Sequence, residues 1–297
     1  MPPTPNITLY TSQTPNGIKI SIALAELNLP YKVHKVDMAA NEQKTLWFTA
    51  INPNGRIPAL TDTLAADGQE IRLFESGSIL QYLVETYDTE HKISYPKGSR
   101  EGIEMTVRSL PFPFALLWPH ETPPLSNRKR EQADERTSKQ CELTNSQNWL
   151  FFQTASQGPA QGHANHYLRY AAEEIPYART RSQDEVRRTY AVLENHLSST
   201  QTPYLVGSKC TIADISLWGW VALSRWAGIE LGDFPALQAW EARMFGREGV
   251  LVGRQVPGEG HQREMLRDPD SMRALEERGR AFYRERAEEG VMTREGV

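Results

Sequence analysis

This sequence of 297 residues contains little cysteine and no large excess of either charge. Its two cysteines, Cys141 and Cys210, lie far apart and fit neither a metal motif nor a disulfide framework, so we expect a reducing compartment and no metal site. The formal net charge of −4 gives no electrostatic reason to bind nucleic acid or an anionic membrane. These absences argue against secreted, metal-binding and nucleic-acid-binding classes.

Long apolar runs are also missing. No uncharged apolar segment approaches the roughly 18 residues that span a bilayer. The first six residues, MPPTPN, have neither the basic start nor the apolar centre of a signal peptide. The chain does have 39% apolar residues and a length sufficient for two ordinary domains. We therefore expect a soluble, cytoplasmic protein that makes no membrane contact.

The first ninety residues alternate short apolar segments with helical patterns. Strands are predicted at 7–10, 31–36 and 71–74, with another following the turn within 51–60. Helices are predicted at 16–27, 44–50 and 76–87. The second strand lies parallel to the first through a right-handed crossover. The resulting order, βαβ followed by ββα, is that of a thioredoxin-like domain.

The segment between the first strand and the first helix has the features of an anion site. Pro15 suits a first helical turn, and the helix start offers unpaired N–H groups and a positive dipole end that stabilise a thiolate. Thioredoxin-like folds place a Cys-Pro-x-Cys pair here, whereas this chain has Thr14-Pro15-Asn16. We therefore expect the thiol to arrive on a ligand, with Asn16, Thr14 and Ser12 as candidate catalytic residues. Helix capping is the structural alternative for Thr14 and Asn16.

Two further loops offer complementary chemistry. Pro58 begins a strand, where a cis Ile57–Pro58 bond would present the Ile57 backbone to a peptide laid alongside. Glu75 and Ser76 open the last helix of the domain, where the N–H groups and the hydroxyl suit a carboxylate and Glu75 suits an ammonium. A thiol site, a peptide edge and an amino-acid site together describe glutathione. As alternatives, Ser76 is a helix N-cap and 52–55 is a simple turn.

Several motifs carry a family resemblance. TPNG-x-K at 14–19, NPNGRIPAL at 52–60 and FESG-x-I-x-x-YL at 74–83 resemble the glutathione transferase superfamily, as do NWLFFQ at 148–153 and LVGSKCTIAD at 205–214. The resemblance is to the fungal nitrogen-regulator-like branch and the bacterial nu class, and it covers about 6–95 and 146–257. It implies an α+β protein with a thioredoxin-like glutathione-binding domain at 1–94 and an all-α substrate domain at 146–257.

The same resemblance implies roles for individual residues. Contacts to glutathione are implied for residues of all three loops: Thr14 and Asn16 near the sulfur, Asn54 or Arg56 near the glycine end, Ile57 with Pro58 on the cysteinyl amide, and Glu75 and Ser76 on the γ-glutamyl group. Arg181 is implied for the glycine carboxylate of a second glutathione, and a solvated arginine is the alternative. Asn16 cannot act as a base, so its amide can only stabilise a thiolate.

The second half of the chain is helical in pattern. A helix over 183–197 carries Val186, Tyr190, Leu193 and Leu197 on one face. We interpret residues Thr211 to Asp214 as a structural capping box ahead of a helix over 215–226. We expect a pocket for an apolar electrophile between the domains, lined by Trp149, Phe152, His166 and Tyr170. His166 either assists the chemistry or simply packs.

Two segments depart from the family pattern. Residues 95–145 stand where a short linker is expected, and they form an atypical linker or an insertion, which is functional, disordered or the translation of an intron. Residues 258–297 form a charged helical extension with Met265, Met272, Leu275 and Phe282 at helical spacing. We expect this extension to dock weakly or to close over the cleft.

The resulting functional prediction is a homodimeric glutathione S-transferase. It would use glutathione as co-substrate and direct the thiolate at a hydrophobic small molecule, by conjugation or by glutathione-assisted isomerisation, as in fungal secondary metabolism. One alternative is a disulfide-bond reductase that uses two glutathiones. Another is a glutathione-binding regulator without catalytic activity.

Overall fold

The computed structural model describes residues 5–63, 68–96, 148–258 and 262–288. The insertion predicted at 95–145 lies outside these ranges except for residues 95 and 96, and Cys141 lies outside them as well. Among the described residues, no helix is both long enough and apolar enough to cross a membrane.

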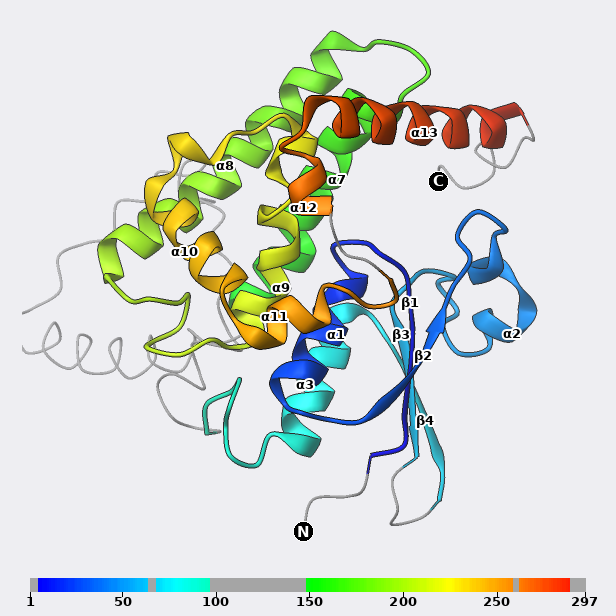
Figure 1. The fold of residues 1–297 in the computed structure, drawn as a ribbon, viewed down its shortest axis with the longest axis vertical. Coiled ribbons are helices and arrows are strands. Elements are labelled where there is room, and N and C mark those ends of the chain that lie inside the picture. Colours follow the sequence, from blue (N-terminus) through cyan, green and yellow to red (C-terminus); the bar gives the residue numbers. More distant parts are fainter. Residues whose placement is uncertain (1–4, 64–67, 97–147, 259–261, 289–297) are drawn as a thin grey trace, which may run out of the picture.

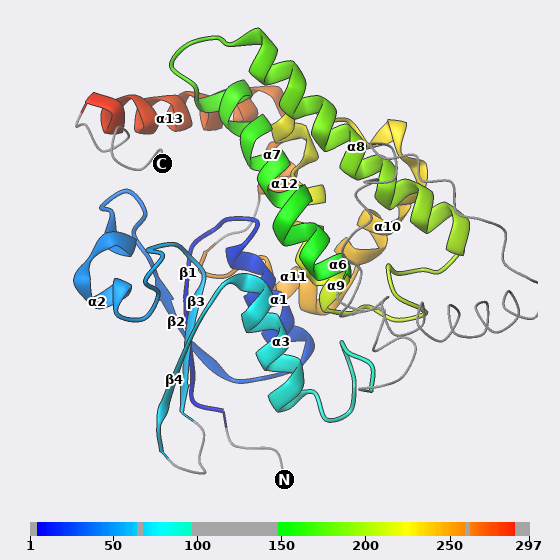
Figure 2. The ribbon, with the colours of Figure 1, turned by 180° about the vertical axis from the view of Figure 1, so that it is seen from behind.

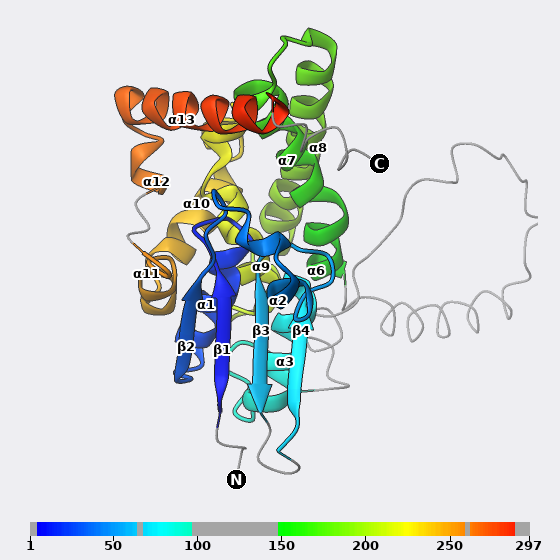
Figure 3. The same ribbon diagram turned by 90° about the vertical axis from the view of Figure 1, so that its right-hand side faces the viewer.

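The N-terminal half forms a four-stranded mixed sheet. Its strands are β1 (Ile7–Thr11), β2 (Tyr31–Lys35), β3 (Ala59–Thr63) and β4 (Glu70–Phe74). Figure 3 shows the spatial order β2-β1-β3-β4, in which β2 runs parallel to β1 and the other two pairs are antiparallel. This arrangement confirms the predicted thioredoxin-like topology.

Two helices cover one face of this sheet and a short one covers the other. Helices α1 (Gly17–Glu26) and α3 (Ser76–Tyr87) share a face, and α2 (Leu46–Thr49) lies opposite, as Figures 1 and 2 show from two sides. The helix predicted at 44–50 is present as α2 but is shorter than predicted. A 3₁₀ turn at Glu42–Lys44 precedes α2, and Thr45 between them is extended with ψ of 155°, which interrupts the helix.

The second half is a bundle of helices. Its first long rod consists of α6 (Asn148–Phe152), a π-helical turn at Gln153–Gln157, α7 (Gly158–Asn165) and a second π-helical turn at His166–Tyr170. The remaining helices are α8 (Pro176–Thr200), α9 (Ile212–Val221), α10 (Pro235–Phe245), α11 (Glu248–Gly253), α12 (Gln262–Met265) and α13 (Pro269–Glu288). The α+β prediction is therefore confirmed.

The predicted core positions of this bundle are buried. The four apolar residues predicted for one face of α8 are all buried: Val186, Tyr190, Leu193 and Leu197. Thr211 and Asp214 form the predicted capping box at the start of α9, and the buried Asp214 carboxylate also accepts hydrogen bonds from the Leu205 N–H and from Trp240 Nε1. Asp214 is thus a structural residue.

Helix α9 ends earlier than the sequence predicts. It stops at Val221 rather than Trp226, and a 3₁₀ turn follows at Ser224–Ala227. The side-chain amide of Gln161 donates to the Trp220 carbonyl at 2.8 Å, so a residue from α7 occupies a backbone acceptor at the end of the helix. A contact from another element therefore lies at this boundary.

Candidate functional site

The turn between β1 and α1 brings the Thr14 hydroxyl to the helix start. Thr14 Oγ1 accepts a hydrogen bond from the Gly17 N–H at 3.0 Å, so Thr14 caps the first turn of α1. The Asn16 side chain makes no capping hydrogen bond. The two residues therefore differ, because Thr14 caps the helix with its side chain and Asn16 does not.

Asn16 contacts a tryptophan from the other domain. Trp220 Nε1 on α9 donates to Asn16 Oδ1 at 3.0 Å. Because the oxygen of the amide is engaged, the two hydrogens on Asn16 Nδ2 are the donors left for a ligand. The sequence motif contained Asn16, but it held no signal for a partner 204 positions away.

The backbone of the same turn lies so close to Gly17 that no side chain fits at this position. A Cβ atom at Gly17 would lie 2.2 Å from the Ser12 carbonyl oxygen and 2.5 Å from Thr11 Oγ1. Glycine is therefore required for Ser12 to lie beside the helix start. Ser12 is half-buried, and its carbonyl also accepts the Thr14 N–H at 2.8 Å.

Residues near the C-terminus brace this turn. Gln13 Nε2 donates to the carbonyls of Arg254 and Gly258, and Gln262 Nε2 on α12 donates back to the Gln13 carbonyl at 2.9 Å. Sequence reasoning missed Gln13 and Gln262, since nothing local marks either as a partner of the other.

The start of α3 has a strained backbone. Glu75 occupies the N-cap position with φ of 65°, in the left-handed region that residues other than glycine rarely adopt. Ser76 is the first helical residue, so the interpretation of Ser76 as the N-cap is wrong. Glu75 is exposed while Ser76 is buried, which places a carboxylate at the surface directly above a buried hydroxyl.

The loop before β3 is ordered by Asn52. Its side chain accepts the Asn54 N–H at 2.9 Å and donates to the Arg56 carbonyl at 2.5 Å. Asn54 Nδ2 in turn lies 3.4 Å from Glu75 Oε1 and so connects this loop to α3. The exposed Arg56 lies beside these residues in the sequence.

The peptide bond between Ile57 and Pro58 is cis, as predicted. Ile57 is half-buried and Pro58 is buried, immediately ahead of β3. The three predicted loops thus end at one edge of the domain, where β1 runs into α1, the Asn52 loop enters β3 and β4 runs into α3.

Lys19 is a site residue that sequence reasoning missed. Its side chain is 1% exposed, and Nζ lies 3.2 Å from Ser76 Oγ and 2.5 Å from Gln153 Oε1. Burial lowers the pKa of Lys19 to about 7, while the negative charge of Glu75 acts in the opposite direction. The available signal was a lysine between two isoleucines in an apolar helix.

The structure divides the predicted walls of the electrophile pocket into two groups. Trp149 is 4% exposed and packs in the core, with its ring centroid 4.6 Å from that of His196 and 5.6 Å from that of Phe152. His166 and Tyr170 lie beyond α7, at the far end of the same rod. These four side chains therefore do not line one common wall.

Helix α13 covers the second group. Tyr283 stacks on Tyr170 with ring centroids 4.7 Å apart, and its ring edge approaches His166. Tyr170 Oη accepts a hydrogen bond from Trp226 Nε1 at 2.7 Å, and burial raises the pKa of this tyrosine. Burial and the nearby His163 lower the pKa of His166.

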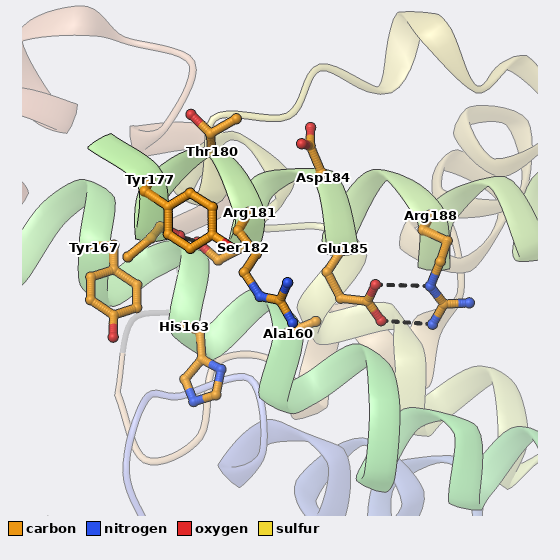
Figure 4. Close-up of a pocket in the computed structure, with 11 residues that line it drawn as sticks. Ala160, His163, Tyr167, Tyr177, Thr180, Arg181, Ser182, Asp184, Glu185 and Arg188 are labelled. Carbon is orange, nitrogen blue, oxygen red and sulfur yellow. Dashed lines mark hydrogen bonds and ion pairs between the residues drawn. The ribbon is translucent and has the colours of Figure 1, made fainter. Parts of the chain in front are cut away.

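Arg181 lies in a hollow between α7 and α8, shown in Figure 4. The hollow has a volume of about 870 Å³, which falls in the range of ligand pockets. Arg181 reaches from α8 toward α7, and His163 and Tyr167 line the opposite side. No described residue of the N-terminal half lines it, so the structure does not bring Arg181 together with Asn16 or Glu75.

In the described part of the chain, no group of three or more His, Cys, Asp or Glu side chains is arranged to hold a metal ion.

Comparisons with known proteins identify the family. Residues 5–85 match the glutathione S-transferase N-terminal domain, and residues 169–248 match the glutathione S-transferase C-terminal domain. The chain is 33% identical over 264 residues to the glutathione S-transferase-like protein tpcF of Aspergillus fumigatus, covering 85% of this chain and 96% of that protein. This protein belongs to the glutathione S-transferase family.

A bacterial relative and a solved structure support the same family. The disulfide-bond oxidoreductase YfcG of Escherichia coli is 35% identical over 242 residues, which cover 81% of this chain and 91% of that protein. The crystal structure of a glutathione transferase homologue from Lodderomyces elongisporus, with two glutathiones per subunit, superposes with a TM-score of 0.66 at 35% identity, covering 85% of this chain and 99% of that one. The predicted superfamily, with fungal and bacterial relatives, is confirmed.

Proposed function

We propose that this protein is a glutathione S-transferase that binds glutathione as a thiolate and directs it at an apolar electrophile. The observation that carries the proposal is the hydrogen bond from Trp220 to Asn16, which leaves the Asn16 amide hydrogens as donors beside the start of α1. Donors at a helix start stabilise a thiolate and lower the pKa of a thiol.

Protein groups at the same edge of the domain are complementary to the rest of the tripeptide. Ser76 and the first N–H groups of α3 suit the γ-glutamyl carboxylate, and the exposed Glu75 suits its ammonium. Ile57 with Pro58 is assigned to the cysteinyl amide, and Asn54 or Arg56 to the glycine end. Similarity to the fungal glutathione S-transferase-like protein tpcF supports glutathione-dependent chemistry. We propose that this protein acts in fungal secondary metabolism, through conjugation or glutathione-assisted isomerisation.

Calorimetric titration of the full chain with glutathione, together with ultraviolet difference absorbance of the thiolate, tests this function. We expect one tight site per subunit. We also expect a thiolate signal at neutral pH, where the thiol of free glutathione is almost entirely protonated. Absence of binding by the folded protein contradicts the proposal. Binding and a thiolate signal without turnover of any apolar electrophile would favour a regulator.

A second candidate is a disulfide-bond reductase that uses two glutathiones. The hollow around Arg181 is large enough for a ligand and presents a guanidinium suited to a carboxylate. The similarity to YfcG and to a homologue with two glutathiones per subunit supports this candidate. Two sites per subunit in the titration, reduced to one by Arg181→Ala, would favour it over simple transfer.

We also propose that the protein is a homodimer. Helix α2 exposes Leu46 by 90% and Trp47 by 42%, which is more apolar surface than a short solvent-facing helix normally shows. Sedimentation of the full chain should give a mass of about twice 33.7 kDa. A monomer at micromolar concentration contradicts this part of the proposal.

A further inference from the structure

The hydrogen-bond partners of the buried Lys19 are neutral, and the Glu75 carboxylate acts on its charge without a hydrogen bond to it. Lysine is almost never fully buried unless it is paired, yet the two hydrogen-bond partners of Nζ are the Ser76 hydroxyl and the Gln153 amide oxygen. Ser76 belongs to α3 of the N-terminal half and Gln153 to the π-helical turn that follows α6. The lysine therefore sits where the two halves meet, directly beneath the start of α3.

The protonation state of Lys19 determines what Ser76 can do. An ammonium has three donors and no acceptor, so it must donate to Ser76 Oγ. A hydroxyl whose oxygen accepts from Nζ directs its own hydrogen away from the lysine and can donate it to a ligand. A neutral amine carries a lone pair and can instead accept the hydrogen of Ser76, which turns the hydroxyl inward.

We propose that Lys19 is a positioning residue for the γ-glutamyl carboxylate: as an ammonium it holds the Ser76 hydroxyl in the donating orientation, and the site takes up a proton when the carboxylate binds to the neutral form. The proton comes from solvent and ends on Lys19 Nζ, and no covalent bond of the ligand changes. This inference rests on the proposed function, because it assumes that an amino-acid carboxylate occupies the start of α3.

The charges around Lys19 support this exchange. Burial lowers the pKa of Lys19 to about 7, so that near neutral pH both forms are populated. Of the groups that act on Nζ, Glu75, the N-cap residue of α3, is charged, whereas Gln153 of the π-helical turn is neutral. A carboxylate that accepts from Ser76 adds a negative charge one hydroxyl away from Nζ, which favours the ammonium.

Proton uptake on binding is the direct test. The ligand should be S-methylglutathione, because its blocked sulfur cannot release a proton of its own. Calorimetric titrations in two buffers of different ionisation enthalpy give the number of protons exchanged. For the full-length wild-type protein we expect at most about 0.1 proton per site at pH 6, where Lys19 is mostly charged, and up to roughly 0.8 proton per site at pH 8.

Variants assign the proton to its residue. Lys19→Met keeps the length and the apolar stem, and we expect it to bind S-methylglutathione about tenfold more weakly at pH 6 and to take up no proton at pH 8. Lys32→Met is the matched control, since Lys32 is exposed on β2. It should keep the wild-type affinity and the wild-type proton count at both pH values.

The outcomes distinguish a failure of the role of Lys19 from a failure of the proposed function. Binding by the wild-type protein without proton uptake at pH 8 overturns the role of Lys19 alone, as does uptake that persists in Lys19→Met. Absence of binding by the folded wild-type protein overturns the proposed function together with this inference. If Lys19→Met does not fold, absence of proton uptake by the wild-type protein at pH 8 still overturns the inference.

Discussion

Asn16 and Trp220 form the contact on which the proposed thiolate site depends. An amide cannot accept the thiol proton, so its contribution is to place two hydrogens where negative charge develops. The indole N–H of Trp220 determines which end of the amide faces the ligand. A donor held in this way needs no reorganisation when the thiolate forms.

Replacing Asn16 removes those hydrogens. We expect Asn16→Ala to lower kcat/KM with glutathione and an aryl halide by roughly 100-fold, the typical effect of losing one preorganised donor. The acidic limb of the pH–rate profile should also move to higher pH, because the bound thiol ionises less readily. Steady-state kinetics between pH 5 and pH 9 measures both effects, and an unchanged acidic limb would rule out a role for Asn16 in thiolate stabilisation.

Trp220 should act in the same direction through Asn16. Trp220→Phe keeps an aromatic ring but removes the N–H, and we expect a loss of about tenfold in kcat/KM, smaller than that of Asn16→Ala because the amide is still present. Trp226→Phe is the matched control, since it also deletes an indole hydrogen bond, but the partner there is Tyr170. Equal losses in the two variants would argue against a specific link between Trp220 and Asn16.

Lys19 predicts a pH dependence of stability. The unfolded lysine has a pKa of 10.5 and the folded one of about 7, so between these pH values the unfolded state binds more protons. The cost of burying the charge is fully present below pH 7 and is relieved as the pH rises toward 10.5. The wild-type protein should therefore gain roughly 1.4 kcal/mol per pH unit over Lys19→Met across this window.

Urea unfolding of both proteins at pH 7, 8 and 9 measures this difference. Only the change with pH is compared, because Lys19→Met also leaves the hydrogen-bonding groups of Ser76 and Gln153 without a partner. Lys32→Met should run parallel to the wild type. A constant gap between wild type and Lys19→Met would contradict the lowered pKa.

At the scale of elements, α11 packs so closely against α1 that a side chain at Gly253 would clash with the backbone of α1. A Cβ atom at Gly253 would lie 2.4 Å from Ile22 Cα and 2.7 Å from the Ser21 carbonyl carbon, both of which are backbone atoms. Ser21 Oγ donates to the Gly253 carbonyl at 2.7 Å across the same contact. Through this contact α11 packs on α1, the helix that begins directly after Asn16.

A methyl group at this contact should force the two helices apart. We expect Gly253→Ala to lower the free energy of unfolding by about 1–3 kcal/mol, as overpacking does when the neighbours are backbone atoms. The measurement is urea unfolding at pH 7. Gly232→Ala serves as the control, because a Cβ there has no neighbour within 4 Å, and its stability should stay within about 0.5 kcal/mol of the wild type. Comparable losses in both variants would refute the close-packing argument.

For the whole molecule, the C-terminal segment joins the helical half through buried ion pairs. Arg263 on α12 makes a two-pronged pair with Glu241 on α10 at 2.7 and 2.8 Å, and the Glu241 side chain is only 5% exposed. The pairing raises the pKa of Arg263. Helix α13 then lies across the end of α7, as Figure 1 shows, and covers Tyr170.

Removing one member of this pair leaves a buried charge without compensation. We expect Arg263→Met to cost about 3 kcal/mol of stability, since breaking a buried pair is far more damaging than losing an exposed one. Thermal unfolding followed by circular dichroism measures the loss. Arg273→Met, at an exposed pair with Asp270, should change the midpoint little. If Arg263→Met is equally neutral, the C-terminal segment does not contribute to the stability of the folded molecule.

The sequence alone predicted the elements and loops whose signals are local. Strand alternation, the proline and glycine turns and the Thr211–Asp214 capping box each depend on residues a few positions apart, and the structure contains all of them. The helix at 44–50 is shorter than predicted because Thr45 is extended and serves as the N-cap of α2. The N-cap at Ser76 was wrong because Glu75 takes that position with a positive φ, which local propensity does not favour.

Tertiary structure decided which side chains meet at the site. Trp220 lies 204 positions from Asn16, Gln153 lies 134 from Lys19, and Tyr283 reaches Tyr170 from the last described helix. No periodicity or spacing encodes such pairs, because they arise only when separate helices pack together. The sequence by itself determined the family, the fold and the three loops. Packing between the two halves decided the orientation of Asn16 and the burial of Lys19, and packing of α13 within the helical half decided the covering of Tyr170.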